Sequence, residues 1–187
     1  MNSITIRSLK AQDIARIAAD FADLGWNKPA SQYERYLAEQ EAGQRAVRMA
    51  FSGDIFCGYL TVCWQAHYRP FREANIPEIV DFNILPVFRR LGIGAMLMDT
   101  AEELIAGISP LAGIGVGMTA DYGAAQRLYI RRGYLPDGRG LMYEGQPVNY
   151  GKSIPVDDDL CLYFTKELPG GALARPAARV DQSLRLR

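Results

Sequence analysis

The sequence is poor in the residues that bind structural zinc. Its 187 residues include three cysteines, Cys57, Cys63 and Cys161, and a single histidine, His67. The cysteines form no Cys-x-x-Cys pair, so the sequence argues against a zinc site and we expect no metal. An odd number of cysteines in this arrangement fits free thiols, and we therefore expect a cytoplasmic protein.

Long apolar runs and an excess of charge are also missing. No stretch reaches the roughly 18 consecutive apolar residues of a membrane span, and the N-terminus, MNSITIRSLK, lacks the apolar core of a signal peptide. Basic and acidic residues number 21 each, so no overall positive field attracts nucleic acid. We expect neither a membrane nor a nucleic acid as partner. Hydrophobic residues make up 49% of the chain, which is typical of a globular protein with a buried core.

The chain begins with a pattern that predicts one strand and two helices. Residues 4–6 alternate between apolar and polar, and the apolar residues within 14–24 have helical spacing. Ser31 is the expected N-cap of the second helix, with Glu34 completing a capping box and Gly43 as the stop signal.

The rest of the chain predicts more strands than helices. Two β-rich segments, 45–51 and 55–64, flank a short turn and indicate an antiparallel hairpin, which an irregular stretch follows. The remaining predicted elements are a strand at 78–85, a helix around 95–105, a strand at 113–119, a helix at 123–132 and a strand at 160–168. This order predicts an α/β (α+β) domain in which helices cover a mixed sheet.

The last residues differ from the body of the chain. The segment 169–187 is rich in Pro, Gly, Ala and Arg and has no sustained apolar period. We expect one folded domain over residues 1–168 and a flexible tail over 169–187.

A short glycine-containing segment, Arg89-Arg90-Leu91-Gly92-Ile93-Gly94-Ala95, lies between a predicted strand and a predicted helix. Small residues allow a ligand to approach the backbone closely, and the first amides of a helix have no intrahelical partners. The helix dipole and the two arginines add to the attraction for an anion. The segment therefore predicts a phosphate-binding loop, although a tight connection with no ligand would carry the same glycines.

Two other phosphate-binding motifs fail on spacing. A dinucleotide-binding Gly-x-Gly-x-x-Gly motif would need glycine at Leu97, which the helical pattern places in the core. The triplet Gly151-Lys152-Ser153 resembles the end of a P-loop, but the partner glycine would have to stand at Gln146. We interpret the triplet as an ordinary loop.

Two motifs resemble the signatures of the GNAT superfamily of N-acetyltransferases. Arg89-x-x-Gly92-x-Gly94 matches the acetyl-CoA signature Q/R-x-x-G-x-G/A, and the segment 125–134, AQRLYIRRGY, is similar to the second signature A-x-x-L-Y-x-x-x-G-F. The resemblance covers about residues 3–168. It implies the GNAT fold, a mixed and mostly antiparallel sheet whose splayed strands form the acetyl-CoA cleft, and it implies acetyl-CoA as co-substrate.

The same resemblance implies which residues hold the cofactor. The backbone of Phe82, Asn83 and Ile84 would bind the pantetheine arm, with a bulge and strand splaying beyond Ile84. Tyr122 or a neighbour stands where many members carry asparagine, which leaves contacts there open. The other implied cofactor residues are Arg89, Arg90, Leu91, Gly92, Ile93, Gly94 and Ala95 for the pyrophosphate, and Ala125 and Tyr129 from the second signature.

Three residues are candidates for catalysis. Tyr129 matches the tyrosine that commonly protonates the departing CoA thiolate in the family. Glu78 precedes Arg89 by eleven residues, the spacing of the catalytic glutamate in histone-acetylating members, and is the first candidate for general base. Asp81, on the same predicted strand, is the second. A surface glutamate at the start of a strand is the alternative for Glu78.

The acceptor is less defined. Two segments, residues 64–68 with Trp64, His67 and Tyr68 and the acidic triplet 157–159, precede strands that border the acceptor site in this fold. Aromatic and acidic side chains suit a cationic amine, although such a triplet is more often solvated surface. We expect a primary amine of a small molecule as acceptor. Protein amines, or a catalytically idle acyl-CoA-binding module, are the alternatives, and a homodimer is one expected assembly.

Overall fold

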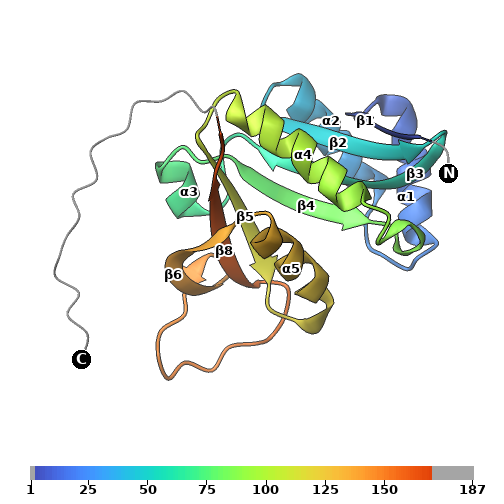
Figure 1. Ribbon diagram of the computed structural model, residues 1–187. Helices are drawn as coiled ribbons and strands as arrows, with labels where there is room; N and C mark the ends of the chain where they lie inside the picture. The colour runs from blue at the N-terminus through green and yellow to red at the C-terminus, as the bar shows by residue number, and fades with distance from the viewer. Residues whose placement is uncertain (1–2, 170–187) are drawn as a thin grey trace.

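The computed structural model describes residues 3–169, so the predicted tail lies, apart from Pro169, outside the described residues. Eight strands form one sheet in this part of the chain, in the order β1-β2-β3-β4-β5-β8-β6-β7 (Figure 1). Neighbouring strands are antiparallel except β4 and β5, which are parallel. The strands are β1 Ile4–Ser8, β2 Arg45–Ser52, β3 Ile55–Cys63, β4 Glu78–Ile84, β5 Leu111–Gly117, β6 Leu135–Tyr143, β7 Gln146–Pro147 and β8 Leu160–Glu167.

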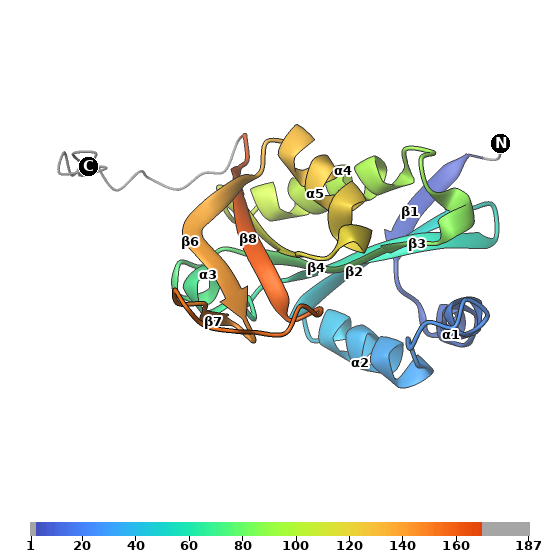
Figure 2. The ribbon, with the colours of Figure 1, turned by 90° about the horizontal axis from the view of Figure 1, so that it is seen from below.

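Helices cover both faces of the sheet. Seen from below, α1 and α2 lie on one face, and α4 and α5 lie on the other (Figure 2). The helices are α1 Ile14–Ala22, α2 Ala30–Glu41, α3 Arg69–Glu73, α4 Ile93–Ala106 and α5 Gly123–Arg131, with short 3-10 turns at Ala11–Asp13, Pro86–Phe88 and Ala120–Tyr122. In the described part of the chain, no helix is long and apolar enough to cross a membrane. The predicted mixed sheet with flanking helices is confirmed.

Each face of the sheet has its own core, because side chains alternate along a strand. Under α1 and α2, Phe21 and Tyr33 pack with Phe56 and Tyr59 of β3, all fully buried. Under α4 and α5, apolar residues of the central strands pack against the helices. This second core includes Leu60, Val62, Ile79, Leu97, Ala101, Ile105, Ile114, Tyr129 and Phe164.

Three local predictions were wrong. Helix α2 begins at Ala30 after Pro29, so Ser31 lies inside its first turn and no side chain caps the helix. The stretch 65–77 contains the short helix α3. Strands β6 and β7 were missed, because β6 is largely exposed and its pairing with β8 is interrupted between Pro136 and Leu141. A strand interrupted in this way shows neither alternation nor an apolar run.

Strand β4 is irregular at its centre. Thr61 of β3 pairs with Val80 and Tyr59 pairs with Asn83, so two β4 residues stand opposite one residue of β3. Asp81, in this bulge, has a φ of 52°, which is the left-handed region. A non-glycine residue there costs about 1–2 kcal/mol. The bulge therefore needs side-chain contacts that hold it.

The splaying of β4 and β5 begins earlier than expected. Within residues 3–169 the two strands pair at Glu78–Gly113 and Ile79–Ile114 alone, and then diverge (Figure 1). The prediction of splayed strands is confirmed, but the ladder ends at Ile79 and not beyond Ile84. The bulge redirects β4 before its end, which explains the difference.

Replacing Gly58 by alanine is expected to lower the free energy of unfolding by about 1–3 kcal/mol. A Cβ at this position would lie 2.9 Å from the Ile84 Cα and closer still to the Asn83 carbonyl oxygen, both backbone atoms of β4. Urea unfolding measures the loss. Gly123→Ala is the control, since a Cβ there meets nothing within 4 Å. Equal midpoints for the two variants would contradict this account.

Candidate active site

The predicted phosphate loop connects β4 to the N-terminus of α4. Gly92 is the N-cap and has a φ of 81°, and Arg90 has a φ of 62°, so the chain turns through two left-handed residues before the helix. The Met96 amide makes the first helical hydrogen bond, to the Gly92 carbonyl oxygen. The amides of the preceding residues, 93–95, open the helix and can bind an anion.

The segments predicted to hold acetyl-CoA converge near Gly94. A Cβ on Gly94 would lie 3.3 Å from the Phe82 ring and 3.9 Å from the Leu128 side chain. The end of β4, the start of α4 and helix α5 therefore meet at this glycine. Arg89 donates from Nε to the Ile84 carbonyl oxygen over 3.1 Å, which ties the loop back to β4.

Glu78 lies at the start of β4, where β4 and β5 still pair, and is 3% exposed. Its Oε2 accepts hydrogen bonds from the amides of His67 at 2.8 Å and Tyr68 at 3.2 Å. Burial raises the pKa of Glu78, although the two amides and nearby charges offset part of the effect. A raised pKa suits a group that must exchange a proton near neutral pH.

The second oxygen of Glu78 has a different environment. Oε1 has no hydrogen-bond partner among residues 3–169, and the buried unpaired oxygens of this part of the chain belong to Gln40 and Tyr134. The carboxylate has one oxygen fixed by the backbone and one free to accept a proton.

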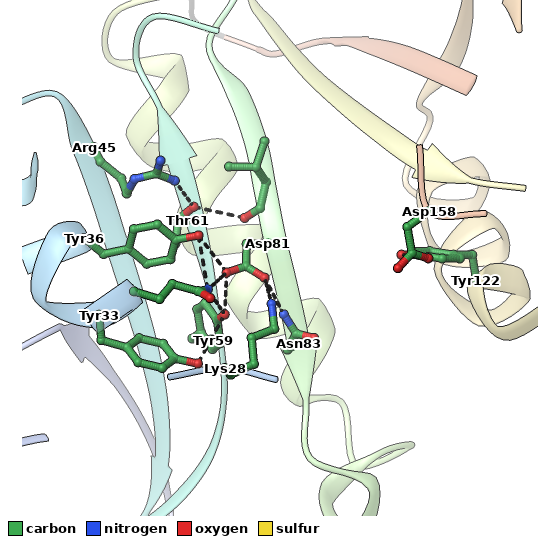
Figure 3. Close-up of polar contacts among 12 residues, drawn as sticks. Lys28, Tyr33, Tyr36, Arg45, Tyr59, Thr61, Asp81, Asn83, Tyr122 and Asp158 are labelled. Atoms are coloured by element: carbon green, nitrogen blue, oxygen red, sulfur yellow. Dashed lines mark hydrogen bonds and ion pairs between the residues drawn. The ribbon is translucent and has the colours of Figure 1, made fainter. Parts of the chain in front are cut away.

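Asp81 is saturated with hydrogen bonds. Oδ1 pairs with Lys28 Nζ and accepts from Asn83 Nδ2 at 2.8 Å. Oδ2 accepts from Gln32 Nε2 at 2.7 Å, the Tyr36 hydroxyl at 2.9 Å and the Tyr59 hydroxyl at 2.5 Å (Figure 3).

Burial alone would raise the pKa of Asp81, but the Lys28 charge and these hydrogen bonds outweigh it and lower the pKa. Burial also raises the pKa of the Tyr59 hydroxyl, which therefore stays a neutral donor. Asp81 is an ionised acceptor with no free position for a further proton donor.

Tyr129 of α5 is 4% exposed and packs in the core between α5 and the sheet. Its hydroxyl has no hydrogen-bond partner among the described residues, and it is not one of the two fully buried oxygens, on Gln40 and Tyr134, that lack a partner there. Burial raises the pKa of Tyr129. Tyr122 donates from its hydroxyl to Asp158 at 3.1 Å, on the other side of the view from Asp81 (Figure 3).

The residues considered for the acceptor separate into two places. Trp64 and His67 line a cavity of about 630 Å³, and His67 is also the residue whose amide holds Glu78. Tyr68 is buried and stacks on Tyr163 with 3.6 Å between ring centroids. The triplet 157–159 is exposed. No group of metal-binding side chains is found within residues 3–169.

Comparison with known proteins identifies the family. The model of the acetyltransferase (GNAT) family matches residues 11–134. The chain belongs to this family. The prediction of a GNAT N-acetyltransferase that uses acetyl-CoA is confirmed. No curated protein matches the sequence.

Solved structures share the GNAT fold at low sequence identity. An N-acetyltransferase from Staphylococcus aureus is 15% identical with a TM-score of 0.66, covering 89% of this chain and 99% of its own. The Salmonella typhimurium protein yncA, solved with its cofactor acetyl-CoA, is 18% identical with a TM-score of 0.64, covering 94% and 100%. Spermidine N-acetyltransferase from Vibrio cholerae, in complex with CoA and spermine, is 14% identical with a TM-score of 0.62, covering 88% and 97%.

The partners of Asp81 could not be predicted from the sequence. Lys28 lies between α1 and α2, Gln32 and Tyr36 lie on α2, and Tyr59 lies on β3. No motif links these positions, because they meet only when α2 packs on the sheet. A lysine before a helix and two tyrosines in apolar stretches carry no signal of their own.

Proposed function

We propose that this acetyltransferase moves the acetyl group of acetyl-CoA directly to a primary amine of a small molecule, with Glu78 as general base. The observation that carries the proposal is the Glu78 carboxylate, which is buried, held by two amides and free at one oxygen. His67, one of the two residues whose amides hold Glu78, also lines a cavity of about 630 Å³, although Glu78 itself is not among the lining residues.

In the proposed reaction the amine nitrogen attacks the thioester carbonyl carbon and the carbon–sulfur bond breaks. Glu78 takes the amine proton through Oε1, directly or through one water molecule. The phosphate loop, residues 89–95, would hold the pyrophosphate, and backbone groups of Phe82, Asn83 and Ile84 would hold the pantetheine arm.

Tyr129 would hydrogen-bond the departing sulfur. Because burial raises its pKa, complete proton transfer from this phenol to a thiolate is uphill, since an ordinary thiol has a pKa of about 8.5. A hydrogen bond that strengthens as charge develops on sulfur stabilises the transition state without that transfer.

Turnover and binding measured together test the function. Purified protein is assayed for CoA release from acetyl-CoA with polyamines, aminoglycosides, amino acids and peptides, and acetyl-CoA binding is measured by calorimetry. We expect release with one class of small amines. Release with peptides alone would favour protein amines, binding without release would favour the idle module, and no binding would overturn the proposal.

Arg89→Glu is expected to weaken acetyl-CoA binding by at least about tenfold, or about 1.4 kcal/mol. The substitution places a negative charge at the start of the loop and removes the contact with the Ile84 carbonyl. Calorimetry measures the dissociation constant. Arg16→Glu is the control, because Arg16 is half exposed on α1 and its ion-pair partner within residues 3–169 is its helix neighbour Asp20. Equal weakening in both variants would contradict a specific role for Arg89.

A further inference from the structure

The buried contacts of Asp81 join the connection between α1 and α2 to strand β4. The proposed acetyl transfer does not itself require these two segments to touch. Lys28 comes from the connection between α1 and α2, and Asp81 comes from the bulge of β4. The side chain of Lys28 is 22% exposed and that of Asp81 is 14% exposed. The ion pair therefore fastens this connection to the centre of β4 from the α2 side of the sheet (Figure 3).

The bulge sends adjacent side chains to opposite faces. Asp81 contacts Tyr36 and Tyr59 in the layer of α2, whereas Phe82 packs in the core beneath α4 and lies next to Gly94 of the phosphate loop. The contacts that hold the Asp81 side chain in place therefore also set the position of Phe82 and of the backbone groups that follow it. Those are the groups proposed to hold the pantetheine arm.

The same connection reaches the phosphate loop by a second route. Trp26, two residues before Lys28, lies under the Arg89 guanidinium at 5.7 Å from the ring centroid. Arg89 in turn donates to the Ile84 carbonyl oxygen. The connection between α1 and α2 thus contacts the bulge at Asp81 and the loop at Arg89.

We propose that Lys28 and Asp81 form a clamp that holds the β4 bulge in the shape that binds acetyl-CoA. Both are positioning residues, and Asp81 does not act as the general base. Its two oxygens accept five donors, and its left-handed backbone needs these contacts to persist. The clamp rests on the proposed function, because it assigns a role in the binding of the same cofactor.

Asp81→Asn and Lys28→Met test the clamp. Each is expected to weaken acetyl-CoA binding by at least about tenfold, or about 1.4 kcal/mol. Lys28→Arg is expected to restore part of the affinity, since it keeps the charge. The acid limb of the pH profile of kcat/KM should keep its position in Asp81→Asn, which separates positioning from proton removal.

Asp13→Asn is the matched control. Asp13 is buried and accepts from Arg7 at 2.6 and 2.7 Å, in an ion pair at the start of α1 that touches no proposed cofactor residue. Melting temperatures identify any variant that is unfolded at the assay temperature. We expect Asp13→Asn to lose stability but to bind acetyl-CoA as the wild type does.

Two results would overturn the clamp. Folded Asp81→Asn and Lys28→Met proteins that bind acetyl-CoA with wild-type affinity would remove its basis. Loss of the acid limb in Asp81→Asn would make Asp81 the base. Binding by the wild-type protein is measured first: if the wild type does not bind, the proposed function fails, whereas equal binding by wild type and variants rejects the clamp alone.

Discussion

Replacing Glu78 by glutamine should lower kcat/KM for acetyl transfer by about 10²–10⁴-fold, the usual contribution of a general base. Glutamine has nearly the same shape, and its side-chain oxygen can still accept from the amides of His67 and Tyr68. Acetyl-CoA binding should therefore persist. The measurement is CoA release against pH, and the acid limb of the wild-type profile should disappear in the variant.

The same substitution should not destabilise the protein at neutral pH. Because the pKa of Glu78 is raised in the folded state, its contribution to stability is complete below the ordinary glutamate pKa and is lost as pH rises through the folded pKa. Urea unfolding should show the stability of Glu78→Gln rising relative to that of the wild type as the pH increases above the ordinary glutamate pKa. Glu73→Gln, at an exposed position, is the control. Full activity in Glu78→Gln would exclude Glu78 as the base.

Replacing Tyr129 by phenylalanine should lower kcat by about 10²–10³-fold, as removal of one donor to a developing anion does. The ring remains in the core between α5 and the sheet, so acetyl-CoA affinity and melting temperature should change little. Since the raised pKa keeps the Tyr129 hydroxyl protonated well above neutral pH, the wild-type rate should show no alkaline loss from this group. Single-turnover kinetics with a saturating acceptor measure the step.

Tyr134→Phe is a matched control for this experiment. Tyr134 is fully buried with its ring centroid 6.0 Å from that of Tyr129, and its hydroxyl has no partner among the described residues. Burial and the nearby Glu102 carboxylate raise the pKa of Tyr134, so its hydroxyl stays neutral, and removing it leaves the ring in place and should not reduce the rate. An equal loss of rate in both variants would show that Tyr129 acts through packing.

Much of the fold was predictable because the elements that carry it have clear periods. Helix α4 has apolar residues at helical spacing, and the β2–β3 hairpin has a short turn between two β-rich runs. The predicted start of α2 was wrong because Pro29, and not Ser31, is the residue before the helix. The proline ring fixes a φ angle that suits this position without a side-chain cap. Strand β6 could not be predicted because its two glycines and its proline resemble a loop.

The candidate site was predictable where residues lie close in sequence. The phosphate loop and helix α5 each contain a contiguous motif, and Leu128 of α5 lies 3.9 Å from where a Cβ on Gly94 of the loop would stand. The environments of Glu78 and Asp81 were not predictable. The two amides that hold Glu78 and the lysine that pairs with Asp81 depend on how distant segments pack, which no local pattern records.

The early end of the β4–β5 ladder gives the sheet two inner edges. Beyond Ile79 and Ile114, the facing edges of β4 and β5 no longer pair with each other. Each edge therefore carries backbone N–H and C=O groups that have no strand partner on that side among the described strands. Unpaired backbone groups on the outer edge of a sheet can pair with another chain. These two edges instead face each other and meet where β4 and β5 still pair, at Ile79 and Ile114. In the proposed function, the pantetheine arm of acetyl-CoA, which has its own amide groups, would hydrogen-bond to these edges as an added strand does.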